Sequence, residues 1–249
     1  MRTKKSLFTS LLAIALLFSY AGFAQEEEKE SYGMAQIIYI DAKVGMEKEF
    51  VNSVKAHNAM YHKEGVYAAG LDVVLSGNEA GWYVWYMGPC TFTDLDNAPG
   101  PGAHADHWDT NVAPNIQSYG RQEYWRSNSK LSYQDGKTEV NFSEMWFINI
   151  KRGDYYRFKA ILGKIKEAFK KRGKGSMRVF NNQFDDSDGR DVAIAWDMKN
   201  LAEMDNDDES IKKEYEELNG KGSWGNMLDE WEEITVSINS QLWENDIAK

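Results

Sequence analysis

All four histidines of the chain lie between positions 57 and 107. Two of them, His104 and His107, fall in the segment AHADHWD with Asp106 between them. Imidazole nitrogens and carboxylate oxygens are ligands for divalent metals such as zinc or iron. A helix that begins after Gly102 would place the two histidines three positions apart, on one face. The segment therefore predicts His104, Asp106 and His107 as metal-ligand candidates, with a polar surface cap as the alternative.

The other two histidines, His57 and His62, lie in a predicted amphipathic helix. His57 comes three residues after Val54 and four before Tyr61, so it lies on the apolar face. A histidine on such a face is either a hydrogen-bonded core residue or a ligand, general base or haem contact. His62 comes five residues later, off the four-residue spacing that would let it share a metal with His57. We expect His62 to be exposed.

A second kind of site needs only an apolar pocket with a few polar groups that orient a substrate. The candidate ligand-binding residues for it are Tyr39, His57, Trp82 and Trp85, since Trp82 opens a strongly aromatic run, WYVWY. The sequence assigns no catalytic residue. It contains no Gly-x-Ser-x-Gly elbow and no glycine-rich phosphate loop after a strand, and Cys90 lies in no recognisable motif.

The first 24 residues have the pattern of a secretory signal peptide. Basic residues at Arg2, Lys4 and Lys5 precede an apolar run, and small residues precede a cleavage position before Gln25. The apolar run is shorter than the ~20 residues that a spanning helix needs. We therefore expect a mature chain from about residue 25 that is exported, periplasmic or secreted, and not inserted in the membrane after cleavage.

Charge and cysteine content exclude further classes. The formal net charge is −10, and loss of the three basic residues of the leader makes it more negative. Such a chain repels nucleic acid, which requires basic surfaces. Cys90 is the single cysteine, so no intrachain disulfide can form and the core must supply the stability.

An internal repeat organises the chain. The stretch KVGMEKEF at residues 43–50 has a counterpart, KRGDYYRF, at residues 151–158. Two more pairs follow in the same order and at nearly constant separation: FTDLDN with LAEMDN, and NSKL with NSQL. Ordered self-similarity indicates duplication. We interpret residues 25–136 and 137–249 as two copies of one unit.

Each copy shows the same alternation of strand-like and helix-like periodicity, in the order βαββαβ. In the first copy we expect strands at 35–40, 66–75, 82–87 and 130–133, and a first helix that ends at a Gly65 cap. In the second we expect strands at 144–150, 176–184, 192–196 and 235–243, a helix at 155–171 and helical segments between 201 and 231. The second-copy helix carries an apolar stripe of Phe158, Ile161, Leu162, Ile165 and Phe169.

This element order, repeated in tandem, resembles the dimeric α/β-barrel superfamily. The resemblance implies an α+β fold in which two tandem ferredoxin-like βαββαβ units pack their antiparallel sheets into one α/β barrel. The superfamily includes cofactor-free monooxygenases, haem-degrading and chlorite-dismutase-like enzymes, isomerases and stress-response barrels. Fold alone does not select among these functions.

Three functional hypotheses follow. The first is a non-catalytic exported barrel that binds a small ligand. The second is a small-molecule oxygenase or isomerase, haem- or metal-dependent, with its site in the first unit, where the histidines lie. The third is a glycan-binding module. The sequence requires no cofactor and leaves haem, a divalent metal and oligomerisation open.

Overall fold

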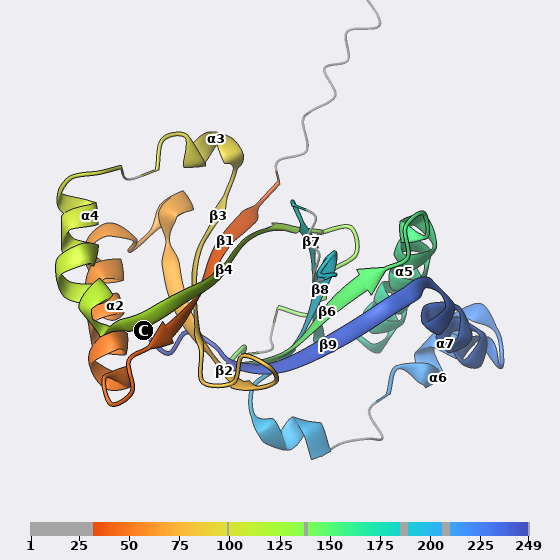
Figure 1. Cartoon of the computed structure of the whole chain (residues 1–249). Helices are drawn as coiled ribbons and strands as arrows, with labels where there is room; N and C mark the ends of the chain where they lie inside the picture. Colours follow the sequence, from red (N-terminus) through yellow and green to blue (C-terminus); the bar gives the residue numbers. More distant parts are fainter. Residues whose placement is uncertain (1–31, 99, 137–138, 185–188, 206–209, 249) are drawn as a thin grey trace, which may run out of the picture. The chain divides into compact units, whose positions relative to one another are not determined.

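The computed structural model describes residues 32–98, 100–136, 139–184, 189–205 and 210–248 (Figure 1). The predicted signal peptide lies outside these residues. The strands are β1 Met34–Ala42, β2 Ala69–Ser76, β3 Tyr83–Cys90, β4 Ile116–Ser127, β5 Tyr133–Gln134, β6 Phe142–Ile150, β7 Ser176–Asn182, β8 Val192–Met198 and β9 Thr235–Glu244. The helices are α2 Glu47–Tyr61, α3 Phe92–Leu95, α4 Ala103–His107, α5 Tyr155–Arg172, α6 Lys212–Asn219 and α7 Ser223–Ile234. Among the described residues, none of these helices has the length and apolar character needed to cross a bilayer.

The strands form one antiparallel sheet in the order β4-β1-β3-β2-β9-β6-β8-β7-β5. A further pairing of β4 with β7, in which Trp125 lies opposite Asn182, partly closes the strands into a ring. The first four strands lie in the order β4-β1-β3-β2, and strands β6 to β9 lie in the corresponding order β9-β6-β8-β7. The two sets join through β2 with β9 and through β4 with β7.

Alternation along the strands separates an inner face from an outer face. In β1, Ile37 and Tyr39 belong to a cluster that draws on both sets of strands and includes Phe147 and Trp243. Ile40 instead packs with Phe50 of α2 in a second cluster. The sheet of the first set is therefore apolar on both faces, with one face toward the ring interior and the other toward α2.

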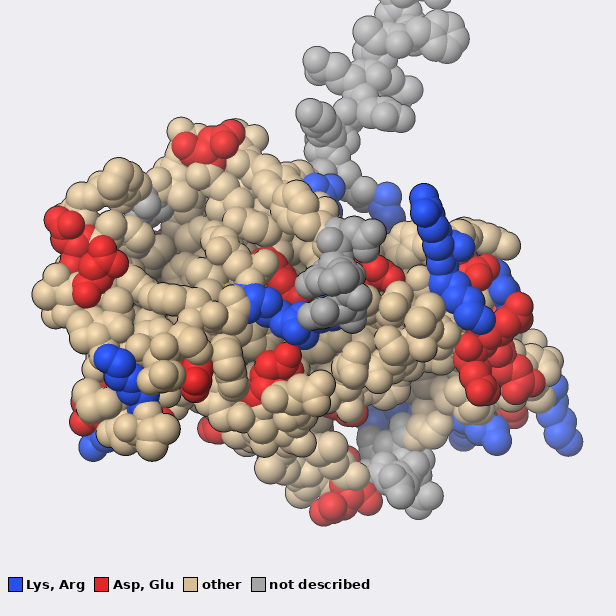
Figure 2. All heavy atoms as spheres, viewed as in Figure 1, with Lys and Arg blue, Asp and Glu red and all other residues tan. Residues whose placement is uncertain are grey.

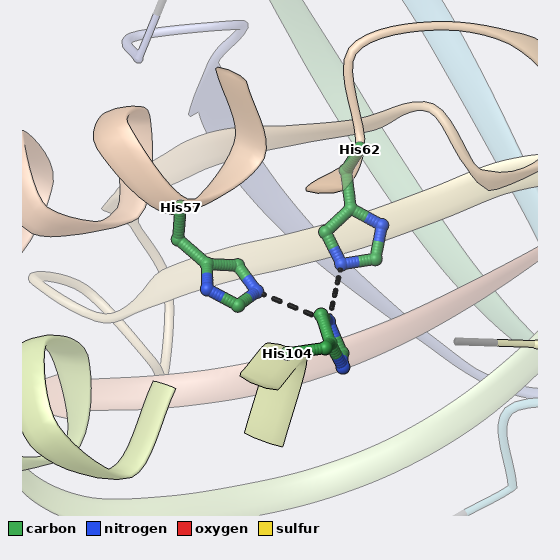
Figure 3. Close-up of side chains that lie close together, drawn as sticks. All are labelled: His57, His62 and His104. Atoms are coloured by element: carbon green, nitrogen blue, oxygen red, sulfur yellow. Dashed lines mark hydrogen bonds between the residues drawn. The ribbon is translucent and has the colours of Figure 1, made fainter. Parts of the chain in front are cut away.

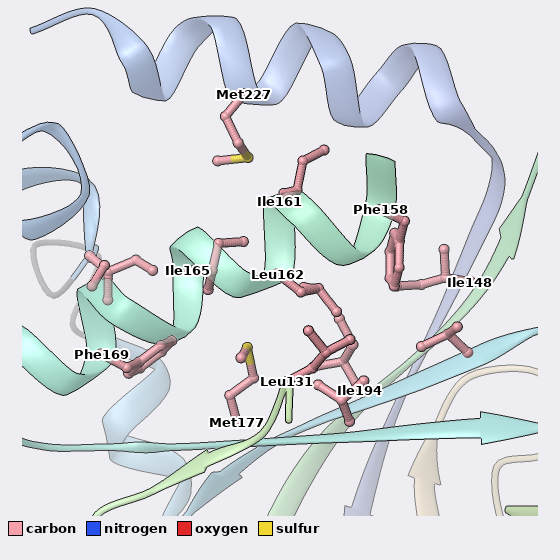
Figure 4. Packing of buried hydrophobic residues seen from close by; sticks show 14 of the residues in the cluster. Leu131, Ile148, Phe158, Ile161, Leu162, Ile165, Phe169, Met177, Ile194 and Met227 are labelled. Atoms are coloured by element: carbon pink, nitrogen blue, oxygen red, sulfur yellow. The ribbon is translucent and has the colours of Figure 1, made fainter. Parts of the chain in front are cut away.

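Helix α5 covers the outer face of the second set of strands. All five predicted stripe residues are buried, and Figure 4 shows them between Met227 of α7 and the sheet residues Met177 and Ile194. The basic end of α5 is paired with α6, through Lys171 with Glu217 and Arg172 with Glu214. In Figure 2, basic and acidic side chains lie side by side at this end of the molecule.

The predicted last strand of the first unit, at residues 130–133, is wrong. The last strand of the first set is instead β4, Ile116–Ser127, and of the predicted range only Tyr133 lies in a strand, the two-residue β5. The Asn128 side chain accepts a hydrogen bond from the Leu131 N–H in the turn that follows β4. The NSKL segment is thus a turn, whereas NSQL lies within β9. The middle of β4 is largely solvent-exposed and polar, so the sequence lacks the apolar alternation by which a half-buried strand is recognised.

A buried ion pair ties the two strand sets together. Arg190, which precedes β8, donates from Nη2 to the Tyr39 hydroxyl at 2.9 Å and to Glu123 Oε2 at 3.1 Å. Its guanidinium lies 3.4 Å from the centroid of the Phe147 ring. Burial raises the pKa of Tyr39, so this phenol stays protonated.

Candidate metal centre

The four histidines, from two separate segments, meet on the outer face of the first strand set. His57 lies on the buried face of α2 with Phe50 and Val54, as predicted. Helix α4 begins at Ala103, after Gly102, whose φ of 106° suits glycine, and so it carries His104 and His107 on one turn. The Tyr61 hydroxyl donates to the Ala103 carbonyl at 3.0 Å and holds the start of α4 against the end of α2.

Three Nε2 atoms converge (Figure 3). His104 Nε2 lies 3.2 Å from His57 Nε2 and 3.0 Å from His62 Nε2. His57, His62 and His104 form a group whose potential ligand atoms all lie within 4.8 Å of one another. Nitrogens bound to one zinc ion at 2.0–2.1 Å are roughly 3.3 Å apart in tetrahedral geometry. Both distances from His104 Nε2 are thus close to the spacing that one small cation would impose.

Hydrogen bonds on the far side of the rings determine which nitrogens can bind a cation. His62 Nδ1 lies 2.9 Å from the Tyr67 carbonyl, which can only accept, so Nδ1 carries the proton and Nε2 keeps its lone pair. His57 Nδ1 lies 3.1 Å from His107 Nδ1. When His57 Nδ1 donates this hydrogen bond, His57 Nε2 keeps its lone pair and can also bind a cation. Such outer hydrogen bonds are usual for metal-bound histidines.

The surroundings of His57, His62 and His104 lower the pKa of all three and so favour neutral imidazoles. Burial, followed by the neighbouring imidazoles of His62, His104 and His107, lowers the pKa of His57 to about 3. Burial also lowers the pKa of His62 and of His104. Neutral imidazole is the form that binds metals, because a protonated ring has no lone pair to donate.

Aromatic side chains enclose the cluster. The Trp108 ring lies edge-on to His57 with centroids 5.0 Å apart, and the Trp85 ring meets His62 at 5.3 Å. Trp85 is held by its Nε1, which donates to Asn58 Oδ1 at 3.0 Å. An apolar shell of this kind limits water access and strengthens electrostatic interactions inside the site.

The structure groups the predicted residues differently from the sequence. Tyr39 and Trp82 pack with the interior cluster, whereas His57 and Trp85 lie on the outer face, so the four do not line one pocket. Asp106 is exposed and outside the group of converging ligand atoms. His107 contacts His57 instead of the point of convergence.

His62 is the residue that the sequence prediction missed. It is only 4% exposed, which contradicts the expected surface position. Helix α2 ends at Tyr61 rather than at the predicted Gly65 cap, so His62 is already outside the helix with φ −133°. Helical spacing therefore does not determine its direction, and its ring turns back toward His57.

The donor set does not suit haem. A porphyrin occupies the equatorial positions of its iron and leaves two axial positions on opposite faces of the ring. Three imidazole nitrogens that lie close together cannot all bind an iron whose two free positions are on opposite faces of the porphyrin. They suit a small ion with three adjacent ligand positions instead.

No protein-family model and no curated protein matches the sequence. The fold resembles solved structures. A candidate monooxygenase from Lactobacillus acidophilus NCFM has a TM-score of 0.54 at 15% identity, with 87% of this chain and 95% of that chain covered. A candidate monooxygenase from Fusobacterium nucleatum subsp. nucleatum has 0.54 at 8% identity, covering 87% and 94%. A mutant chlorite dismutase from Candidatus Nitrospira defluvii has 0.51 at 9% identity, covering 87% and 92%. At such identities the likeness concerns the fold alone, and it supports the ferredoxin-like α+β prediction.

Proposed function

We propose that this chain is a metal-dependent enzyme that acts on a small molecule, with one divalent transition-metal ion bound by His57, His62 and His104. The convergence of their three Nε2 atoms carries the proposal. Imidazole ligands suit zinc, copper, iron and nickel. When bound, such a metal supplies Lewis-acid or oxygen chemistry at its open position.

The number of converging ligands favours catalysis over a structural role. Structural zinc sites are closed by four protein ligands, whereas catalytic sites use three and leave a position for water or substrate. His107 is bonded to the far nitrogen of His57 and so does not provide the fourth ligand. The surrounding residues would then orient the ligands and limit water access. His107 holds the ring of His57, and the Tyr67 carbonyl holds the ring of His62. Trp85 and Trp108 pack beside these rings.

Within the enzyme class we favour an oxygenase. This choice is an analogy from fold, because neighbours of similar architecture are described as candidate monooxygenases and as a chlorite dismutase. The alternative, a non-catalytic barrel that binds a small ligand, is favoured by one observation, a pocket of about 460 Å³ lined by residues of both strand sets, among them Trp125, Phe147 and Trp243.

Metal analysis of the purified protein tests the proposal. We expect about one equivalent of a transition metal per chain, or uptake of one equivalent of Co²⁺ after chelation and dialysis. A cobalt ion with three nitrogen ligands and one or two waters gives the strong visible absorption of low-coordinate geometry. Binding of Co²⁺ with no preference over Mg²⁺ or Ca²⁺, which prefer oxygen ligands, would contradict the proposal.

His107 is expected to act on the metal only through His57. Loss of the hydrogen bond that orients a ligand typically weakens metal binding by 10- to 100-fold. We therefore expect His107→Ala to lower Co²⁺ affinity by about that factor while the stoichiometry stays at one. Asp106→Ala, on the same turn but exposed, is the matched control and should leave the affinity unchanged. Loss of the whole site in His107→Ala would instead make His107 a direct ligand.

We further propose that residues 25–136 and 137–249 arose by duplication, and that the chain is exported after removal of residues 1–24. The matching spatial order of the two strand sets supports the duplication. The basic and apolar pattern of residues 1–24 supports export. The histidines then belong to one copy, because α5 carries Ile165 and Lys170 where repeat alignment places His57 and His62.

A further inference from the structure

The segment from Gly102 to Asn111, which we call the flap, carries α4 and lies against α2 (Figure 1). All of its residues are described, and none of them is buried. It is fixed at its far end by Val112, which is 0% exposed and belongs to the core cluster that contains Phe50 and Val54. Segments with few buried apolar side chains open locally at little cost in free energy. The flap therefore depends on polar contacts to stay closed.

His104 joins the flap to the two buried histidines through a single nitrogen. Its Nε2 lies 3.2 Å from His57 Nε2 and 3.0 Å from His62 Nε2. A nitrogen of a neutral imidazole has either one proton or one lone pair, so His104 Nε2 cannot form a full hydrogen bond with both neighbours at once. A cation between the rings would instead bind all three nitrogens through their lone pairs. Without metal, the flap is held weakly at the point where a metal would hold it best.

The other contacts of the flap lie near the surface. The Tyr61 hydroxyl donates to the Ala103 carbonyl at 3.0 Å, and Trp108 Nε1 donates to the Tyr119 hydroxyl at 2.8 Å, and both bonds are exposed. Trp108 is the only large apolar side chain of the flap, and it is partly buried beside Trp85. Exposed hydrogen bonds add little to the closed state, because water replaces the lost partner when they break.

The corresponding layer of the second strand set is attached differently. It lies between β8 and β9, as the flap lies between β3 and β4, and it contains α6 and α7. Tyr215, Met227 and Ile234 of this layer are at most 5% exposed and pack in one cluster with α5 (Figure 4). Apolar burial of this kind holds a helix in place without any ion. The dependence on histidines is therefore particular to the first strand set.

The closed flap covers the metal-ligand candidates. His57 and His62 are 1% and 4% exposed, and the Trp108 ring lies edge-on to His57. A cation cannot reach nitrogens that are shielded from solvent to this degree. Helix α2 is held in the core by Phe50 and Val54, whereas the flap has no buried residue. The flap is thus the element that must move to admit an ion.

We propose that the flap is a metal-operated lid. In the metal-free protein it opens between Gly102, whose φ of 106° suits glycine, and the anchor at Val112, and it admits the ion to His57 and His62. Coordination by His104 then holds it closed. This inference rests on the proposed metal centre and adds how that centre is filled and covered.

Hydrogen–deuterium exchange of the mature chain, metal-free and with Co²⁺, tests the lid. In the metal-free protein we expect the amides of residues 103–111 to exchange faster than those of α7. Co²⁺ at about a hundred times its dissociation constant should slow the flap amides by up to about a hundredfold, because a ligand that binds only the closed state favours it by that factor. The amides of α7 should not respond.

Two variants on the flap separate the lid from the rest of the site. In His104→Ala the flap amides should stay fast at the same Co²⁺ concentration, because the flap then carries no ligand. Asp106→Ala, exposed on the same turn, is the matched control and should keep the response to Co²⁺.

A variant of α2 tests the opening itself. Tyr61→Phe removes the hydrogen bond to Ala103 and leaves all three ligands in place. It should speed Co²⁺ uptake roughly fivefold, as expected for the loss of one hydrogen bond. The visible absorption of bound Co²⁺ after rapid mixing measures the rate. Tyr156→Phe, exposed on α5, is the control for the same change and should leave the rate as it is.

Four results would overturn the lid: flap amides that exchange as slowly as those of α7 without metal, flap amides that do not respond to bound Co²⁺, α7 amides that slow as much as the flap, or uptake that is unchanged in folded Tyr61→Phe. The absorption of bound Co²⁺ distinguishes these results from a failure of the metal centre. If one equivalent binds and the flap does not respond, the lid is wrong and the centre stands. If no Co²⁺ binds, the centre is wrong and the lid with it.

Discussion

Replacement of His57, His62 or His104 by alanine, one at a time, is expected to weaken metal binding by roughly a hundred- to a thousand-fold. Structural zinc sites with four ligands bind with apparent free energies of about 10–16 kcal/mol, so one ligand accounts for roughly 2.5–4 kcal/mol, which is a factor of about 10² to 10³ in affinity. The three Nε2 atoms meet at one point, and removal of any one leaves only two protein ligands. Competition of Co²⁺ binding against a chelator of known affinity measures the effect.

The three positions should behave alike, although His62 lies outside the helix that carries His57. Any activity that the metal confers should fall with the same variants. Asp106→Ala serves again as the control, because its carboxylate is exposed and outside the group of converging ligand atoms. Unchanged affinity in folded His62→Ala would exclude the three-histidine site and return His62 to a core role, bonded to the Tyr67 carbonyl.

Arg190→Met is expected to lower the free energy of unfolding by about 3 kcal/mol, because it leaves Glu123 as a buried charge without its main partner. Both side chains are about 5% exposed, and the arginine also bonds Tyr39 and lies over Phe147. Arg121 lies 3.6 Å from Glu123 and compensates part of the loss. The expected destabilisation is therefore at the lower end of the range for a broken buried ion pair. Urea denaturation measures it.

A double-mutant cycle separates the ion pair from general packing. Glu123→Met alone should also destabilise the protein, and the double variant should lose less than the sum of the two single variants, because neither charge then remains unpaired. Arg152→Met, on the exposed turn before α5, is the matched control and should change the free energy by less than about 0.5 kcal/mol. Strict additivity of the two buried changes would show that the pair is not coupled.

Much of the secondary structure could be predicted because it follows from local periodicity. The apolar stripe of α5 appears at helical spacing in the sequence and is buried as expected. The start of α4 after Gly102 could be predicted for a similar reason, since glycine permits the backbone turn that enters the helix. Strand β4 could not, because its middle is polar and exposed, and its place is decided by pairing with β1 and β7.

The residues of the candidate site could likewise be predicted only in part from the sequence. The concentration of histidines between positions 57 and 107, the apolar position of His57 and the shared turn of His104 and His107 are properties of the sequence alone. The tertiary structure decided that His62 joins them, that Asp106 does not, and that Tyr39 and Trp82 lie across the sheet from His57 and Trp85. Spacing determines direction only within one regular element. Where α2 ends and where α4 packs against it depend on contacts such as Tyr61 with Ala103, 42 residues apart, which no local pattern encodes.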